Sequence, residues 1–361
     1  MSDDELQRLG LYDPAEPGAG ERLVLIRMAL DHGATVDEIR AAIAERRVHA
    51  LAAVRLIEGG AERLTLEEAA ERAGVTEEFA RRIWRALGLA VPEPGARPCS
   101  ELDVEVLRAI RGLFDELGED ATFQIARAMG SSLARLADAE VAAIRARMEA
   151  PLRAGGRGDL DVAREFVRVA QELVPTSTFV IDIVHRHQLA ASGRRYALWG
   201  VKPTEESTTD AVVGFADLVG FTALGQRLDA AELDALVVRF EERALEAATR
   251  PRARLVKLIG DEAMFVAGEA DDAVDIARTL VEDPELRSLR VGLASGTVVT
   301  REGDLFGPAV NLAARLVALA EPDSIVLDAE TARRLRSTSI VPLGTRDIQG
   351  FDEPVEVFAV G

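Results

Sequence analysis

Apolar residues in the first half of the chain recur three or four positions apart, the spacing of a helix that buries one face. The pattern extends from about residue 21 to residue 189. Thr35 and Thr65 each precede an acidic turn, as residues that cap helix starts do. These features predict an all-α N-terminal domain over residues 1–190.

Two of the predicted helices lie close together at residues 64–88, where Gly74 separates two amphipathic stretches. The arrangement resembles a helix-turn-helix, which many DNA-binding proteins use. Acidic residues offset the arginines of this segment, and that balance is a poor match to a phosphate backbone. We therefore expect no nucleic-acid partner here.

Glycine, proline and polar residues are concentrated between the two halves of the chain, at residues 191–209. Gly193, Gly200 and Pro203 interrupt a helical pattern, and polar residues follow from Thr204. We interpret this segment as an interdomain linker.

After residue 209 the pattern changes to short β-rich runs that alternate with amphipathic helices. The predicted strands are 211–215, 254–258, 263–266, 289–294, 324–327 and 355–360, and the predicted helices are 222–227, 230–248, 271–280, 307–320 and 329–335. One hairpin is evident around Gly260. The mixture predicts an α+β domain over residues 210–361, rather than a doubly wound parallel sheet.

Composition is that of an ordinary globular protein, with 48% hydrophobic and 29% charged residues. The net charge of -19 disfavours nucleic acids and anionic membranes as partners. A single cysteine, Cys99, cannot form an intrachain disulfide. No apolar stretch suits a secretion signal or a membrane span. We expect a cytoplasmic protein.

Residues with candidate chemistry occur in three blocks of the second half. In the first, an apolar strand ends at Asp217 and continues through Gly220 into a helix start at Phe221 and Thr222. Backbone N–H groups at such a turn can face an anion, and a carboxylate beside them suggests a metal bridge. An ordinary aspartate near a turn is the alternative for this block alone.

The second block places Asp261 at the tip of the hairpin around Gly260. A Gly-Asp pair needs no function in such a turn. Together with Asp217, however, Asp261 gives two acids at adjacent strand ends, and a divalent cation would hold both ionised. Oxygen ligands with a phosphate nearby favour Mg²⁺ or Mn²⁺.

The third block begins at Asp304 and has Pro308 near a helix start. Asn311 and Arg315 follow, four residues apart and therefore on one helix face. Such a pair can orient a sugar and neutralise charge on a transferring phosphoryl group. A solvated polar face is the commoner alternative.

Together the three blocks resemble the catalytic domain of class III nucleotide cyclases, over about residues 210–360. The resemblance implies a ferredoxin-like fold and conversion of ATP to 3′,5′-cyclic AMP and pyrophosphate with two Mg²⁺ or Mn²⁺ ions per active site. The implied roles are metal binding for Asp217 and Asp261, substrate binding for Lys257, Asp304, Phe221 and Thr222, and catalysis for Asn311 and Arg315.

The resemblance also implies which nucleotide base is recognised and how the catalytic domains assemble. Guanylate cyclases typically carry Glu and Cys at the positions of Lys257 and Asp304, so this pair favours ATP. The family's site lies between two catalytic domains, which implies a head-to-tail homodimer with two equivalent sites. Some members use a further lysine near the C-terminus for the triphosphate; residues 348–353 contain none, and Arg346 is a candidate substitute.

The whole arrangement resembles soluble actinobacterial adenylate cyclases, whose helical N-terminal domain controls the catalytic one. His185 and His187 just precede the predicted linker. Because histidine titrates near neutral pH, they are candidate regulatory residues for a pH response, although lone histidines are more often ordinary surface or core residues. A small-molecule or lipid effector of this domain is another candidate.

Two other functions stay open from the sequence. One is a catalytically weak nucleotide-binding signalling module with the helical domain as its output. The other is a DNA-binding protein with a nucleotide-sensing domain, which the charge disfavours.

Overall fold

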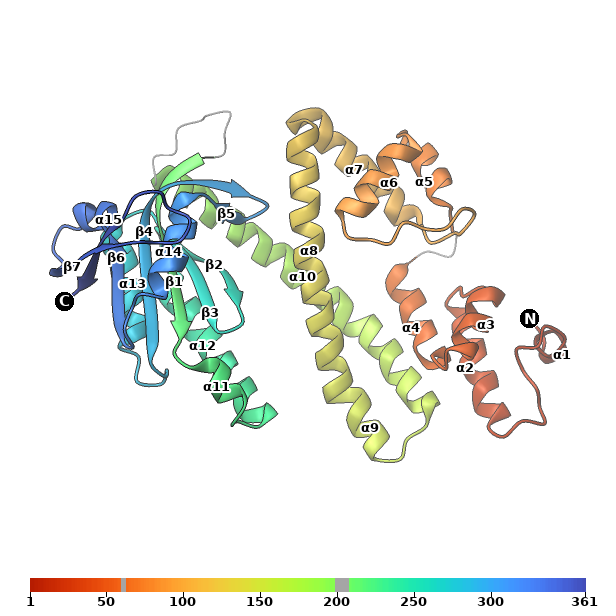
Figure 1. Cartoon of the computed structure of the whole chain (residues 1–361). Coiled ribbons are helices and arrows are strands. Elements are labelled where there is room, and N and C mark those ends of the chain that lie inside the picture. Colours follow the sequence, from red (N-terminus) through yellow and green to blue (C-terminus); the bar gives the residue numbers. More distant parts are fainter. Residues whose placement is uncertain (60–62, 199–207) are drawn as a thin grey trace. The chain divides into compact units, whose positions relative to one another are not determined.

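The computed structural model of the chain describes residues 1–59, 63–198 and 208–361, without the side chains of residues 198 and 222. These residues divide into two units, Met1–His185 and Arg186–Gly361. Figure 1 shows helices in the first unit and a sheet with helices in the second. The predicted order of a helical domain followed by an α+β domain is confirmed.

The first unit is built from helices, as the apolar pattern predicts. They are α1 (Asp3–Arg8), α2 (Ala19–Asp31), α3 (Val36–Ala44), α4 (Val48–Glu58), α5 (Leu66–Ala73), α6 (Glu77–Ala86), α7 (Glu101–Leu117), α8 (Glu119–Ile144), the π-helical turn η1 (Arg145–Glu149), α9 (Ala150–Ala154) and α10 (Asp159–Leu198). Helix α10 begins in this unit, and its residues from Arg186 onward belong to the second unit. Capping boxes at Thr35 and Thr65 begin α3 and α5. Among the described helices, none combines the length and the apolar character needed to cross a membrane.

Helices α5 and α6 form the predicted helix-turn-helix-like segment. Gly74 ends α5 in the left-handed region with φ of 72°, and the Thr76 side chain caps α6. Phe79, Ile83 and Trp84 of α6 are buried in a cluster that also takes side chains from α5, α7 and α8. The apolar faces of both helices therefore build one of the hydrophobic clusters of this unit.

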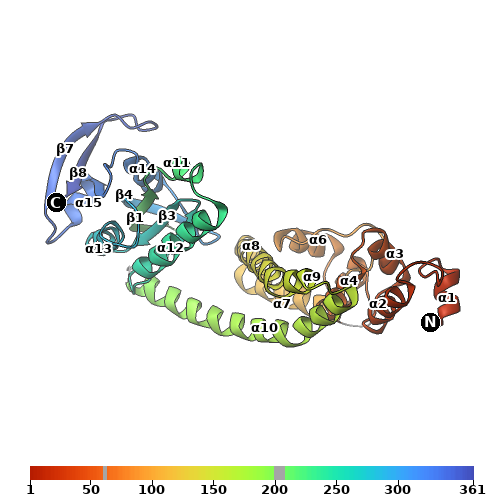
Figure 2. The same cartoon turned by 90° about the horizontal axis from the view of Figure 1, so that it is seen from below.

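The predicted linker at residues 191–209 begins too early. Helix α10 continues to Leu198, and β1 starts at Thr208 (Figure 2). Gly193 costs a helix only about 1 kcal/mol, and the alanines, arginines and leucine around it favour helix. The remainder of the predicted linker, residues 199–207, lies outside the described part of the chain.

The second unit contains, in its described residues, an eight-stranded sheet with the order β2-β3-β1-β4-β6-β8-β7, and β5 pairs with β4 alone. The strands are β1 (Thr208–Leu218), β2 (Ala253–Ile259), β3 (Glu262–Ala267), β4 (Leu289–Arg301), β5 (Asp304–Phe306), β6 (Ser324–Asp328), β7 (Ile340–Arg346) and β8 (Val355–Val360). The β4–β6 pair is parallel, and the other pairs are antiparallel. This topology confirms the antiparallel-rich α+β fold.

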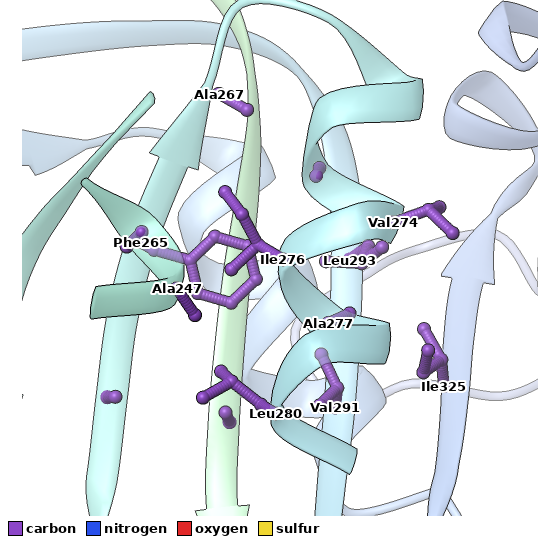
Figure 3. Close-up of a cluster of buried hydrophobic side chains, with 14 of the residues drawn as sticks. Ala247, Phe265, Ala267, Val274, Ile276, Ala277, Leu280, Val291, Leu293 and Ile325 are labelled. Carbon is purple, nitrogen blue, oxygen red and sulfur yellow. The ribbon is translucent and has the colours of Figure 1, made fainter. Parts of the chain in front are cut away.

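Helices cover both faces of this sheet. They are α11 (Phe221–Gly225), α12 (Ala230–Ala248), α13 (Ala270–Val281), α14 (Pro308–Val317) and α15 (Ala329–Arg334). A first hydrophobic cluster joins one face to α12 and α13, where Ile276 and Leu280 pack near Phe265 and Leu293 (Figure 3). A second hydrophobic cluster joins the other face to α14. The sheet is therefore buried on both sides.

Strands β5 and β7 are absent from the sequence prediction. Strand β7 lies at the edge of the sheet, is almost wholly exposed and contains Pro342 and Gly344. An edge strand without a buried face has no alternation of apolar and polar residues to reveal it. Strand β5 has only three residues.

Helix α14 packs directly on the backbone of β4. A Cβ atom added at Gly292 would lie 2.5 Å from the carbonyl oxygen of Ala313 and 2.5 Å from the backbone nitrogen of Val317. The absence of a side chain at Gly292 thus sets how closely the helix that carries Asn311 and Arg315 approaches the sheet.

We predict that Gly292→Ala destabilises the protein by about 1–3 kcal/mol, because backbone atoms of α14 would have to move to accommodate the new methyl group. Urea unfolding followed by circular dichroism measures the change. Gly225→Ala is the matched control, because a Cβ there meets nothing within 4 Å. Equal stability of the two variants would contradict the close packing.

Candidate active site

Three charged side chains stand side by side across the ends of β3, β1 and β4. Asp217 on β1 pairs in register with Glu262 on β3 and with Arg290 on β4. Side chains alternate along a strand, and Phe215 and Met264, two residues away from the acids, belong to the cluster under α14. The charged row therefore lies on the α14 face of the sheet.

Arg290 forms an ion pair with Asp217. Its Nη2 donates to the Asp217 Oδ2 at 2.5 Å, and the two side chains are 31% and 19% exposed. The Arg290 Nε is buried and has no hydrogen-bond partner among the described residues. The guanidinium therefore keeps a donor for a further acceptor. The sequence prediction missed Arg290, although it is the single charged residue in the apolar run 289–294.

The hairpin between β2 and β3 brings Asp261 to the same place. The turn residue Gly260 has φ of 64°, and the Asp261 carbonyl oxygen accepts from the Leu218 N–H at 3.1 Å. Burial raises the pKa of the Glu262 carboxyl, and the charges of Asp217 and Asp261 raise it further. The two predicted metal acids thus meet in a local excess of negative charge.

Lys257 and Asp304 form a direct pair across 47 positions of sequence. The Lys257 Nζ donates to the Asp304 Oδ2 at 2.5 Å, and the Leu305 N–H donates to the Asp304 Oδ1 at 2.8 Å. Both side chains are about one third exposed, at 38% and 31%. The two residues predicted to read the base thus lie together at a surface that a ligand can reach.

Asn311 and Arg315 lie on the outer side of α14. Leu312, Ala313 and Leu316 of this helix are buried against the sheet, whereas Asn311 and Arg315 are exposed. Both line a hollow of about 450 Å³ whose other wall includes residues 349–351, in the connection between β7 and β8. The predicted catalytic pair therefore faces away from the sheet of its own chain.

The other predicted residues lie outside these three pairs. Phe221 is partly buried and packs against the first hydrophobic cluster, and the side chain of Thr222 lies outside the description. His185 and His187 are exposed on α10. Arg346 is exposed on β7, where its Nη1 donates to the Thr345 carbonyl oxygen at 3.1 Å.

The six central residues are therefore assembled as three pairs. Asn311 and Arg315 make no side-chain hydrogen bond or ion pair with the other four in the part of the chain that the structure describes. No cluster of three or more His, Cys, Asp or Glu side chains arranged for a metal ion occurs among those residues. Within the described residues, therefore, no direct side-chain bond joins Asn311 or Arg315 to the other four.

Two protein-family models match the chain. The model described as an adenylate cyclase regulatory domain matches residues 8–192, and the model described as an adenylate and guanylate cyclase catalytic domain matches residues 201–360. The two matches correspond to the helical domain and the α+β domain.

Relatives share both domains. The chain is 38% identical to an adenylate cyclase of Streptomyces coelicolor, over 80% of this chain and 75% of that protein. It is 31% identical to a pH-sensitive adenylate cyclase of Mycobacterium tuberculosis, over 88% of this chain and 80% of that protein. Among solved structures, it is similar to the guanylate cyclase domain of RhGC from Catenaria anguillulae in complex with GTP, with 23% identity and a TM-score of 0.40 over 44% of this chain and 98% of that one.

The Asp217–Arg290 pair predicts that the two clustered aspartates differ in their effect on stability. Without divalent cations, Asp217→Asn should destabilise the protein by about 1–3 kcal/mol, because a charged partner of the partly buried Arg290 is lost. Asp261→Asn should be neutral or stabilising, because it removes a like charge beside Glu262. Urea unfolding with a chelator present measures the free energy of unfolding of both variants and of the wild type. Equal losses would contradict this arrangement.

Proposed function

This chain belongs to the adenylate cyclases that join a helical regulatory domain to a catalytic domain, and we propose that it converts ATP to 3′,5′-cyclic AMP and pyrophosphate. The observation that carries the choice of base is the contact of Lys257 with Asp304. An ammonium donates hydrogen bonds and a carboxylate accepts them. Together they complement the adenine edge, which offers a ring nitrogen as acceptor and an amino group as donor.

The acids beside Leu218 fit a divalent cation. Asp217 and Asp261 offer oxygen donors. The pKa of Glu262 is raised first by burial and then by the negative charges of Asp217 and Asp261, which a cation would offset. Asp217 and Asp261 would hold Mg²⁺ or Mn²⁺, two per active site. When bound, such ions lower the pKa of the ribose 3′-hydroxyl and neutralise the phosphate oxygens. Substrate and water would complete the coordination.

Arg290 is the cation beside these acids. Its Nε lacks a hydrogen-bond partner among the described residues. If Asp217 bound a divalent cation, its carboxylate would interact less strongly with the Arg290 guanidinium. Arg290 can then donate to a phosphate oxygen, since arginine matches phosphate geometry well. This places Arg290 ahead of Arg346 as the substitute for the missing C-terminal lysine, because Arg346 is exposed on β7.

The chemical step needs no protein nucleophile. The ribose 3′-hydroxyl gives its proton to solvent water, and its oxygen attacks the α-phosphorus of the same ATP molecule. The bond between the α-phosphorus and the oxygen that bridges to the β-phosphorus breaks, and pyrophosphate leaves with that oxygen. Asn311 orients the ribose, and Arg315 neutralises charge that develops on the phosphorus oxygens. Arginines with this task raise the rates of phosphoryl transfer by about 10³- to 10⁵-fold.

The direction of α14 supports a shared site. Asn311 and Arg315 point away from the sheet face that carries Asp217 and Asp261, so one chain does not bring the two sets to one substrate. A head-to-tail homodimer would place the metal acids of one chain opposite α14 of the other, and would do so twice. The active enzyme is therefore a homodimer with two equivalent sites.

The helical domain would control this activity, as its match to an adenylate cyclase regulatory domain suggests. A pH response through His185 and His187 belongs to the same proposal. Both lie exposed on α10, ahead of the catalytic domain, and one relative is named a pH-sensitive adenylate cyclase. A small-molecule or lipid effector of the helical domain is the competing stimulus.

Cyclic AMP formation tests the proposed activity. Full-length protein with Mn²⁺ or Mg²⁺ should form cyclic AMP from ATP and should prefer ATP to GTP. A chelator should abolish turnover, because the clustered acids then lack their counter-charge. Binding of ATP without product in either metal would instead favour a nucleotide-binding signalling module.

Mixing two inactive variants tests the shared site. Asp217→Ala and Arg315→Ala should each be nearly inactive. Under conditions of subunit exchange their equimolar mixture should recover about one quarter of wild-type activity, because half of the dimers are mixed and each has one intact site.

The control is a mixture of Asp217→Ala with Asp261→Ala. Every site of that mixed dimer lacks one metal acid, so no activity should return. Recovery in neither mixture, although exchange is verified with differently tagged chains, would refute the shared-site arrangement.

A further inference from the structure

Arg254 lies on β2, three residues before Lys257, and contacts the turn that precedes Asp304. Its Nη2 donates to the Gly303 carbonyl oxygen at 3.0 Å, across 49 positions of sequence. Nothing in the sequence pattern distinguishes Arg254 from the many other arginines of the chain. The contact joins the strand that carries Lys257 to the turn that precedes Asp304.

A β-bulge sets the direction of Lys257. Arg254 pairs with Val266 and Leu255 with Phe265, but Lys257 pairs with Met264, so Val256 is the extra residue. Val266 and Met264 both belong to the cluster under α14. Because opposite residues of an antiparallel pair share a face, the bulge places Lys257 on the same face as Arg254.

The turn that Arg254 contacts has an unusual backbone. Glu302 has φ of 55° and Gly303 has φ of 83°, both in the left-handed region, and the turn joins the paired residues Arg301 and Asp304. Such two-residue turns direct the strands that they connect. The Gly303 carbonyl precedes Asp304, so a bond to that oxygen limits rotation of the backbone just before the carboxylate.

Electrostatics favour the same arrangement. Burial lowers the pKa of Arg254 from its ordinary value, the charge of Arg195 lowers it further, and the negative charge of Asp304 opposes both effects. The guanidinium remains charged, since arginine does not lose its proton in proteins. A partly buried charge needs an acceptor, and the Gly303 carbonyl oxygen supplies one.

We propose that Arg254 is a positioning residue for base selection: it holds the turn at Gly303, and this keeps the Asp304 carboxylate in place beside Lys257. The proposal rests on the base-reading role of Lys257 and Asp304 given above. Arg254 itself does not contact the substrate. Its loss should therefore affect discrimination between ATP and GTP more than it affects the chemical step.

The test compares Arg254→Met with Arg301→Met. Methionine keeps an unbranched side chain without the hydrogen-bond donor. Arg301 belongs to the same turn, but its side chain is 62% exposed and lies 3.9 Å from the carboxylate of its neighbour Glu302. Arg254→Met should lower the ratio of kcat/KM for ATP to that for GTP by about fivefold, the effect of one net hydrogen bond, mainly through a raised KM for ATP. Arg301→Met should leave the ratio unchanged.

Two further variants separate positioning from folding. Arg254→Lys keeps a charge and a donor, so its ratio should lie between those of the wild type and Arg254→Met. In an Asp304→Ala background, Arg254→Met should no longer change the ratio, because the residue through which it acts is gone.

Each outcome decides a different point. If Asp304→Ala leaves the ratio unchanged, the proposed base-reading role fails. If Asp304→Ala changes the ratio, two results would still contradict the proposal for Arg254. One is that Arg254→Met lowers kcat/KM equally for ATP and GTP. The other is that Arg254→Met still changes the ratio in the Asp304→Ala background. Urea unfolding of every variant identifies any loss that comes from folding, and Arg254→Lys decides the matter if Arg254→Met does not fold.

Discussion

Repulsion between like charges at the ends of β1 and β3 is the constraint on which the catalytic domain depends. Asp217, Asp261 and Glu262 would move apart in a flexible chain, because like charges repel. Burial, and then the charges of Asp217 and Asp261, raise the pKa of Glu262. The fold holds them together through apolar burial on both faces of the sheet and through the bond from the Leu218 N–H to the Asp261 carbonyl. Positive charge is therefore required at this place. Arg290 supplies part of it, and a divalent cation would supply the rest.

The close approach of α14 to the sheet has two consequences. Gly292 lets the helix backbone lie directly on β4, which buries Leu312 and Leu316 and stabilises the fold. The same contact leaves Asn311 and Arg315 on the outer side of the helix. In the homodimer proposed above, α14 of one chain would lie opposite the acids of the other, without any change in the fold of either chain.

The candidate residues named from the sequence lie near turns and helix starts. Asp217 and Asp261 adjoin glycine turns, and Asn311 follows a proline at a helix start, so strand and helix boundaries located them. Arg290 and Arg254 lie inside strands, and their partners are 73 and 49 positions away. Such pairings depend on strand order and register, which no local pattern contains. Lys257 was predicted from the resemblance to class III nucleotide cyclases, which did not point to either arginine.

The base-reading pair depends on an irregularity in the sheet. In a regular strand Lys257 would point to the opposite face from Arg254, toward α12 and α13, because side chains alternate. Leu255 and Leu258 do pack on that side, whereas Val256 packs on the other. The bulge at Val256 adds one residue and thereby brings Lys257 to Asp304.

The side chains of Arg254 and Lys257 then make different contacts. The planar guanidinium of Arg254 holds a backbone carbonyl. In the proposed function, the compact ammonium of Lys257 would exchange the carboxylate for a ring nitrogen of the substrate. The contact between Lys257 and Asp304 depends on strand register as much as on residue identity.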